Sequence, residues 1–457
     1  MANPGSPPLP RQQSSAPWMA SEPLRSASSH DLRIQAHENS EAALSNFWDR
    51  FTRRGKENVG VRQSLKAIVF SSFCFLAIIP LERLFDYGGE QMTFYLGKEL
   101  GDLLVITLNN AVEATLAIIL LLRRELKLLQ STIVGVVILH LLLIPGTSFI
   151  IGGARIMHQH LHPHFTQLNQ TLLTIGVLSL LLPAAYFGAL DRAAITSEFL
   201  ERQPVLSDDS RDTFLVLSRG ISVVLLVVYV CSRIFLHNPP GPDDLEDQGG
   251  AEQSSGVHKP EAGPEVNQYI CIIMLIISIG LMAATAEWLV EAVEPVREDG
   301  HIKEEWFGLI LLPFLSFAAD GVVAVVYFLR FLVRYFFKGP EPPNIQAKAR
   351  AIDLSIQFML FWMPFFVLLG WWTNRPLSLL FDFFEIAILI GACFIVNYVT
   401  ADSKTNWAEG LGMVSFYVMI AICAWFYPGQ PEIQAMLFDG PIAEGIASVT
   451  SGVTEHH

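Results

Sequence analysis

The sequence predicts an all-α membrane protein with about ten transmembrane helices, arranged as two inverted five-helix repeats. Three observations lead to this fold class. The chain of 457 residues is 51% hydrophobic and has a mean hydropathy of +0.40. Only 16% of its residues are charged, against about 25% in soluble chains. The apolar residues form runs of bilayer-spanning length, and two of these runs carry a carboxylate at equivalent positions.

The domain organisation follows from where the apolar runs begin and end. Residues 1–60 are rich in Ser, Pro, Gln and Arg, which predicts a disordered amino-terminal tail. An acidic, Pro/Gly-rich linker at 237–267 separates a first repeat, 64–236, from a second repeat, 268–427, and a carboxy-terminal tail covers 428–457. We expect spans near 64–85, 101–122, 128–153, 169–190, 213–236, 268–291, 306–330, 352–374, 379–400 and 407–427.

The direction of the repeats follows from the number of spans in each. Five is odd, so the second repeat enters the membrane upside down relative to the first. Basic residues before the first span place the amino terminus in the cytoplasm, but the basic residues from Arg334 to Arg350 favour the opposite orientation. The membrane orientation therefore stays open.

The second span, Gly101 to Leu122, carries Asn109, Asn110 and Glu113 in its middle. A charged side chain at the bilayer centre costs roughly 2.5–3.5 kcal/mol on insertion scales, so such residues usually face an ion path or a partner. Asn109 and Asn110 precede Glu113 by four and three positions, and a continuous helix would place all three on one face. The alternative is a structural carboxylate that is bonded to a neighbouring side chain.

The seventh span repeats this arrangement. Gly101 precedes Glu113 by twelve positions, and Gly308 precedes Asp320 by twelve. A second acid at the equivalent position favours a functional pair over an isolated structural carboxylate. Pro313 lies seven residues before Asp320, which predicts a kink that frees backbone carbonyls. Carboxylate and carbonyl oxygens are the ligands that a hard cation requires.

Further polar side chains in or beside the apolar runs are accessory candidates: Asn109, Glu82, Glu287, Asp353, Ser355, Gln357 and His140. Asp353 opens the eighth span, and an N-cap of that helix is the favoured role for it. Glu287 shares a helix face with Glu291, and either acid is a candidate to line a vestibule.

Several other functions are not supported by the sequence. The net charge of −14 argues against nucleic acid as a partner, and the five cysteines are scattered through apolar runs without metal-site or disulfide spacing. The chain has no phosphate-binding loop and no nucleotide-binding glycine cluster. It also lacks the Gly-x-Gly-Asp motif expected of an intramembrane aspartyl hydrolase. We therefore predict no enzymatic activity and no cofactor.

A series of motifs occurs in one order along the chain: Leu76 to Glu82, Asn110-Ala-Val-Glu113, Phe307 to Pro313, Pro364 to Trp371 and Asn406 to Gly410. In these motifs the chain resembles the calcium/proton exchangers, the CAX family of the calcium/cation antiporter superfamily, from about Phe75 to Pro428. The resemblance implies a fold like that of the sodium/calcium exchangers.

The signature of that family, Gly-Asn-Ala-x-Glu, occurs once in each repeat. The first copy has Asn109 in place of Gly and keeps Asn110 and Glu113. The second copy is degenerate, because Ser316, Phe317 and Asp320 replace Gly, Asn and Glu. The chain therefore resembles a divergent member of the family. The resemblance implies a metal site with these ligands: Glu113, Asp320, Asn110 and Ser316.

The resemblance also implies a function. It predicts a secondary active transporter that exchanges calcium for protons across an intracellular membrane, such as that of the vacuole, by alternating access. Two carboxylates in a dry cavity can hold protons or one divalent cation, and this competition couples the two fluxes. Two alternatives stay open: an exchanger selective for manganese or a monovalent cation, and a non-transporting regulatory paralogue. The expected partners are the lipid bilayer, small cations and protons, and homo-oligomerisation stays open.

Overall fold

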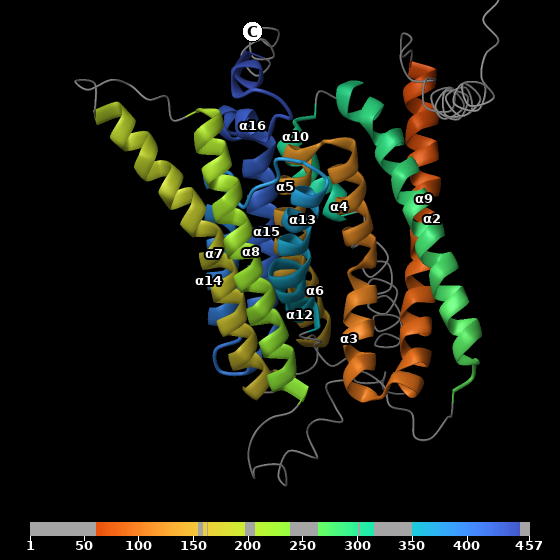
Figure 1. Ribbon diagram of the computed structural model, residues 1–457. Coiled ribbons are helices and arrows are strands. Elements are labelled where there is room, and N and C mark those ends of the chain that lie inside the picture. Colours follow the sequence, from red (N-terminus) through yellow and green to blue (C-terminus); the bar gives the residue numbers. More distant parts are fainter. Residues whose placement is uncertain are drawn as a thin grey trace, which may run out of the picture. The chain divides into compact units, whose positions relative to one another are not determined.

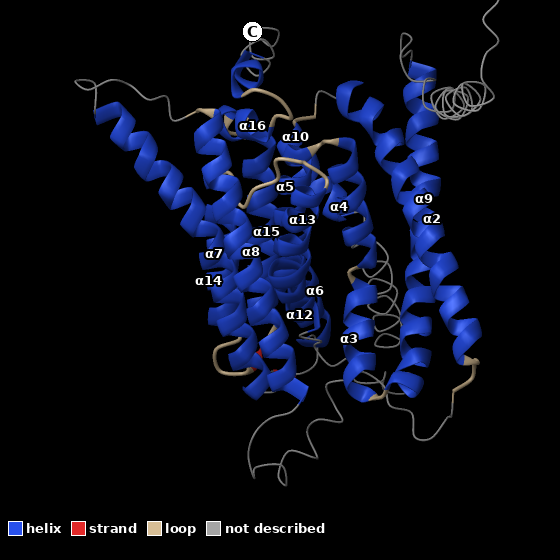
Figure 2. Ribbon diagram, in the orientation of Figure 1, coloured by secondary structure: helices blue, strands red, loops and turns tan. Residues whose placement is uncertain are grey.

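The computed structural model describes residues 61–153, 159–161, 163–196, 206–237, 264–299, 302–314 and 350–447. These residues are helical almost throughout, with one small pair of strands (Figure 2). The tail 1–60 and residues 238–263 of the predicted linker lie outside the described residues, as do residues 315–349.

The described helices of the first half are α2 (Val61–Leu96), α3 (Lys98–Asn109), α4 (Ala111–Arg123), α5 (Leu126–Ile138), the π-helix η2 (Leu139–Leu143), α6 (Ile144–Gly153), α7 (Pro163–Thr196) and α8 (Asp208–His237). Those of the second half are α9 (Gln268–Asp299), α10 (Glu304–Trp306), the π-helix η6 (Phe307–Leu311), α12 (Arg350–Gln357), the π-helix η7 (Phe358–Trp362), α13 (Met363–Trp372), α14 (Phe383–Val399), α15 (Trp407–Phe426) and α16 (Pro431–Leu437). Strand β1 (Gln159–His160) pairs antiparallel with β2 (Lys404–Thr405).

Within the described part of the chain, six helices are long and apolar enough to cross a membrane, and the bent pair of α3 and α4 makes a seventh if it is counted as one span. Two of these spans are central, because 78% of the apolar window in Leu126–Ile151 and 67% of that in Ala351–Trp372 is buried. The corresponding share is 28% for α8, 33% for α9 and 28% for α15. Their many exposed apolar side chains suit contact with lipid, so these three helices are peripheral.

The first helices of the two halves, α2 and α9, lie side by side and run in opposite directions (Figure 1). The Cys271 thiol donates a hydrogen bond to the Gly88 carbonyl at 3.3 Å, and the Tyr95 hydroxyl donates to the Val266 carbonyl at 2.7 Å. Residue numbers therefore rise along α2 as they fall along α9. This antiparallel pairing is what an inverted repeat requires of its equivalent helices.

Each described π-helix ends two residues before a proline: η2 before Pro145, η6 before Pro313 and η7 before Pro364. Proline has no N–H group, and its ring clashes with the carbonyl four residues earlier in a regular helix. The preceding residue instead bonds five residues back, as the Ile144 N–H does to the Leu139 carbonyl. Because η2 and η7 interrupt the central spans of the two halves in the same way, they are a second sign of the repeat.

Glycines allow the central helices to approach closely. A Cβ on Gly135 of α5 would clash with the Leu309 carbonyl of η6, and one on Gly308 would lie 2.8 Å from the Ser131 Cβ. The α6–α15 contact has the same basis, since a Cβ on Gly146 would lie 2.9 Å from the Gly410 carbonyl oxygen. Small residues let membrane helices gain packing contacts that the lipid cannot supply.

The chain after residue 428, predicted as a tail, includes α16 and a further helical stretch at 442–447. Ile433 and Met436 of α16 are buried, at 1% and 3% exposure. Arg211 at the start of α8 donates to the carbonyls of Phe438 and Gly440 at 3.2 and 2.6 Å. Apolar burial and these hydrogen bonds hold this segment against the bundle.

Candidate cation-binding site

The stretch around Asn110 is two helices instead of one. α3 ends at Asn109, α4 begins at Ala111, and the two axes differ by 56°. The prediction of a continuous span, with Asn109, Asn110 and Glu113 on one helix face, is therefore wrong. The backbone of Asn110 has φ −92° and ψ 8°, outside the helical range, and its side chain is bound by a helix of the other half.

The Asn110 side chain is buried completely, and its amide nitrogen forms hydrogen bonds. Its Nδ2 donates to Oε1 of Gln357 at 2.6 Å and to the Leu354 carbonyl at 3.3 Å. Gln357 is held in turn, because its Nε2 donates to the Thr107 hydroxyl at 3.0 Å. Among the described residues, the Asn110 Oδ1 has no hydrogen-bond partner. A buried oxygen without a partner costs about 1–3 kcal/mol, so this oxygen is suited to binding a cation.

The helix break adds further ligands of the same type. A helix leaves its last carbonyls and its first N–H groups without intrahelical partners, so α3 offers oxygens where α4 offers the positive end of its dipole. Glu113 is buried, with 7% exposure, in the first turn of α4, next to the positive end of this dipole. A carboxylate, an amide oxygen and backbone carbonyls together form the kind of ligand set that calcium prefers.

The predicted second half of the site lies outside the described residues. Asp320, Ser316 and Phe317 all fall in the stretch 315–349. Their pairing with Glu113 and Asn110 therefore stays a prediction. Pro313 is described, and it continues the helix directly after η6.

Gln357 is the accessory candidate that the structure brings to Asn110. His140 and Ser355 are buried but bond to their own helices: the His140 Nδ1 lies 3.0 Å from the Val136 carbonyl, and the Ser355 hydroxyl donates to the Ala351 carbonyl at 3.2 Å. Thr107, which sequence reasoning missed, shares a face of the α3 region with Asn110 at a spacing of three residues.

The acidic accessory candidates have other surroundings. Glu287 is exposed and lies 3.4 Å from Arg123 at the end of α4, ten residues or about 15 Å along the helix from Glu113. Glu82 on α2 and Asn109 at the end of α3 are partly buried. The helix break thus brings Gln357 to Asn110 while Glu287 lies toward the opposite end of α4.

Asp353 does not cap a helix, and the N-cap prediction is wrong. α12 begins at Arg350, so Asp353 lies within its first turn. Its Oδ1 accepts from the Arg233 Nη2 at 2.8 Å, and its Oδ2 accepts from Nη1 at 3.4 Å. A carboxylate in an apolar bundle needs a counterion, and Arg233 of α8 supplies it.

A second group of buried charges, missed by the sequence analysis, lies at the start of α5. Lys127 Nζ is 2.7 Å from Asp382 Oδ2 and 3.4 Å from Glu385 Oε1, and the Ser131 hydroxyl donates to Glu385 at 2.6 Å. Asp382 and Glu385 also form the capping box of α14, which is why that helix begins at Phe383 and not near residue 379. The pattern Asp-x-x-Glu before an apolar run was the available signal.

Glu305 lies close to this group, immediately before the span predicted from Trp306. It is 4% exposed and accepts a hydrogen bond from Gln434 Nε2 at 3.0 Å. Burial raises the pKa of its carboxyl to about 7, while the nearby Lys127 acts in the opposite direction. Glu305 therefore changes its charge near neutral pH.

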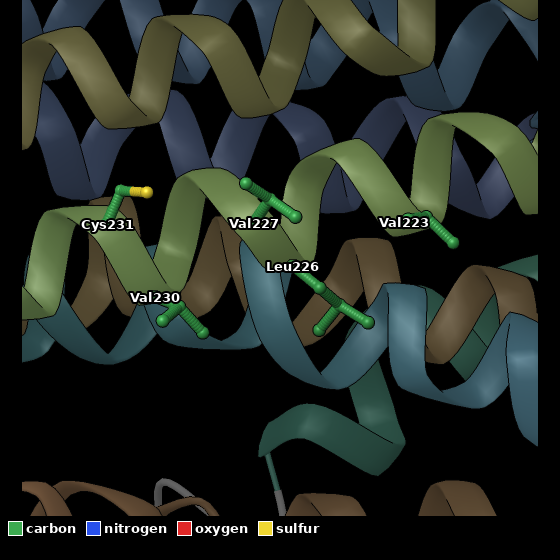
Figure 3. Close-up of a pocket in the computed structure, with 5 residues that line it drawn as sticks. All are labelled: Val223, Leu226, Val227, Val230 and Cys231. Carbon is green, nitrogen blue, oxygen red and sulfur yellow. The ribbon is translucent and has the colours of Figure 1, made fainter.

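A shallow groove of about 270 Å³ on α8 is a different kind of feature (Figure 3). All five lining side chains come from α8: Val223, Leu226, Val227, Val230 and Cys231. Val223, Val227 and Val230 are more than half exposed. An apolar lining of this kind suits lipid contact and offers no ligands for a cation.

A broken spanning helix with buried oxygen ligands, within helices that repeat in opposite directions, is typical of inverted-repeat secondary transporters. The chain belongs to the sodium/calcium exchanger protein family, whose model matches residues 66–237 and 270–426.

Named relatives and solved structures agree with this assignment. The chain is 28% identical to a vacuolar calcium ion transporter of Cryptococcus neoformans, covering 78% of this chain and 69% of that protein. It is 29% identical to a vacuolar calcium ion transporter of Schizosaccharomyces pombe (77% and 78% covered) and 27% identical to a Ca²⁺/H⁺ antiporter of Aphanothece halophytica (78% and 90% covered). The resemblance to calcium/proton exchangers is thereby confirmed.

The fold is also that of a solved structure, native YfkE. It superposes with a TM-score of 0.56 at 21% identity, covering 79% of this chain and 92% of that one. The H⁺/Ca²⁺ exchanger CAX superposes with a TM-score of 0.50 at 12% identity, covering 92% and 98%. These similarities confirm the predicted exchanger fold.

Proposed function

We propose that this protein exchanges calcium for protons across an intracellular membrane, that of the vacuole or another endomembrane compartment, by alternating access. The names of its relatives, vacuolar calcium ion transporter and Ca²⁺/H⁺ antiporter, support the ion and the membrane. The observation that carries the proposal is the buried Oδ1 of Asn110, which lies at a helix break three residues before the buried Glu113 and has no hydrogen-bond partner among the described residues.

The chemistry follows from burial. A cation entering the site loses water and must regain oxygen ligands, which the Asn110 amide, the Glu113 carboxylate and the carbonyls at the end of α3 provide. When the cation leaves, a proton on Glu113 removes the cost of a bare buried carboxylate. Asp320 of the second half completes this proposed pair. Each occupant therefore excludes the other, which couples the two fluxes in opposite directions.

The test is calcium uptake into vesicles that contain only the purified full-length protein, driven by an acidic interior. We expect uptake that stops when the proton gradient is collapsed. Glu113→Gln should abolish exchange and leave the fold intact, because Gln fills the same space without the charge. The matched control is Glu90→Gln, which changes an exposed acid of α2 and should transport normally.

Other outcomes would redirect the proposal. Proton-coupled flux that survives in Glu113→Gln would show that the Asn110 region is not the transport site. Flux with manganese, sodium or potassium, but none with calcium, would show a different ion choice. If all four ions fail with the wild type and Phe317→Asn/Asp320→Glu restores flux, the chain is a non-transporting paralogue.

A further inference from the structure

A buried ion pair lies beside the candidate site and has no role in the exchange described above. Arg233 of α8 and Asp353 of α12 contact each other through both guanidinium Nη atoms and both carboxylate oxygens. Their side chains are only 11% and 21% exposed, and the guanidinium lies 4.9 Å from the centre of the Tyr229 ring. Arg233 lies near the end of the α8 span and Asp353 near the start of the α12 span, and both charges are largely shielded from solvent.

The pair lies one helical turn from the residues that hold Asn110. Asp353 and Gln357 are four positions apart on α12, so they share a face of that helix with about 5–6 Å between their Cβ atoms. Gln357 accepts the hydrogen bond from Asn110, and the carbonyl of Leu354, next to Asp353, accepts a second one. The ion pair and the Asn110 amide thus belong to one continuous cluster.

The charge balance of this cluster depends on Arg233. A carboxylate that loses its counterion attracts a cation more strongly, because its charge is no longer balanced. We propose that Arg233 tunes the cation affinity of the site: by neutralising Asp353, it sets the net negative charge that the site around Asn110 presents to a cation. This inference rests on the proposed cation exchange. It predicts that cation affinity changes with each charge of the pair, since affinity follows the charge of the site.

A purely structural pair, which only attaches α12 to α8, predicts something different. Breaking the pair from either side would then loosen the same contact and shift affinity in one direction. An electrostatic role predicts opposite directions. Arg233→Gln leaves an extra negative charge near the site, and Asp353→Asn leaves an extra positive charge there.

The experiment uses the full-length wild type, Arg233→Gln, Asp353→Asn and the double variant. Relative to wild type, calcium affinity should rise on the order of tenfold in Arg233→Gln, fall on the order of tenfold in Asp353→Asn, and return close to wild type in the double variant. Arg233→Lys keeps the charge and should stay within a few-fold of wild type. Two readouts apply: the calcium concentration for half-maximal uptake into vesicles, and that for half-maximal thermal stabilisation in detergent.

The outcomes separate this inference from the exchange itself. Affinity that moves in the same direction in both single variants, or in neither, overturns the role of Arg233 even if the wild type transports calcium. Binding without flux in the wild type overturns the exchange, and the binding readout still decides the role of Arg233. Absence of calcium binding in every variant overturns both. If Arg233→Gln does not fold, the double variant must still bind calcium more tightly than Asp353→Asn.

Discussion

Individual polar side chains in this protein are positioned by partners from the other half of the chain. Asn110 is the clearest case, because its side-chain Nδ2 donates both of its described hydrogen bonds to the second half, one to the Gln357 side chain and one to the Leu354 carbonyl. Its oxygen is thereby directed away from them and has no partner among the described residues. The orientation of this amide, and with it the availability of a ligand oxygen, depends on Gln357.

Removing that partner tests the orientation. Gln357→Ala should let the Asn110 amide rotate, and calcium affinity should fall by about tenfold, the equivalent of one lost buried hydrogen bond. The measurement is the calcium concentration for half-maximal uptake into vesicles. Ser355→Ala is the control, because Ser355 is as buried in α12 as Gln357 and its hydroxyl, among the described residues, bonds within that helix. Unchanged affinity in Gln357→Ala would mean that Asn110 is positioned by its backbone alone.

Glu305 predicts a pH dependence of stability. Its pKa is raised from its usual 4.5 to about 7, so the fold favours the protonated carboxyl. The contribution of Glu305 to the free energy of unfolding is complete below about pH 4.5. It is lost as the pH rises through 7, and the free energy of unfolding falls by up to about 3 kcal/mol. The measurement is the midpoint of thermal unfolding between pH 5 and about pH 8. Glu305→Gln should remove most of the fall in this midpoint. Glu304→Gln, one residue away, removes only a smaller contribution to the raised pKa of Glu305 and should keep most of the wild-type fall. A wild-type profile in Glu305→Gln would contradict the assignment.

Whole helices are shaped by two recurring devices, the π-helix before a proline and the glycine contact. The π-helices η2 and η7 let the central spans pass Pro145 and Pro364 without a break. Gly135 and Gly308 then bring α5 against η6. The packing of these central helices therefore depends on residues other than the candidate ligands.

The glycine contact can be tested directly. Gly135→Ala places a methyl group against the backbone of Leu309 and the ring of Pro313, and should lower stability by about 1–3 kcal/mol. Gly220→Ala on α8 is the matched control, because no heavy atom lies within 4 Å of a Cβ there. Thermal unfolding in detergent should show a lower midpoint for Gly135→Ala only. Equal midpoints for the two variants would mean that α5 and η6 can separate at no cost.

At the scale of the whole molecule, the two halves contribute to one bundle. α2 pairs with α9, and Asn110 of the first half bonds to α12 of the second. If the two repeats share one site, we expect the equivalent acids Glu113 and Asp320 to lie opposite each other.

This placement is a measurable distance. We expect the carboxylates of Glu113 and Asp320 to lie within about 15 Å, since a helix with its side chains is only about 10–12 Å across. Spin labels on Glu113→Cys and Asp320→Cys, in a background with the five native cysteines replaced, would report it by pulsed electron resonance. Spin labels on Glu90→Cys and Asp320→Cys give the reference distance from Asp320 to a residue outside the site. A longer distance for the Glu113 pair than for this reference would exclude a shared site.

The sequence by itself determined the class of protein and its exchanger fold, and it singled out Asn110 and Glu113 as candidate ligands. Hydropathy and spacing carry this information because they are local properties of the chain. Only the tertiary structure decided that the second span breaks at Asn110, that Asp353 pairs with Arg233, and that Lys127 joins Asp382 and Glu385. Asn110 lies 247 residues from its partner Gln357, and Arg233 lies 120 residues from Asp353. Lys127 lies 255 residues from Asp382 and 258 from Glu385. In an apolar bundle each buried polar group must find a partner, and which one it finds depends on how distant helices pack.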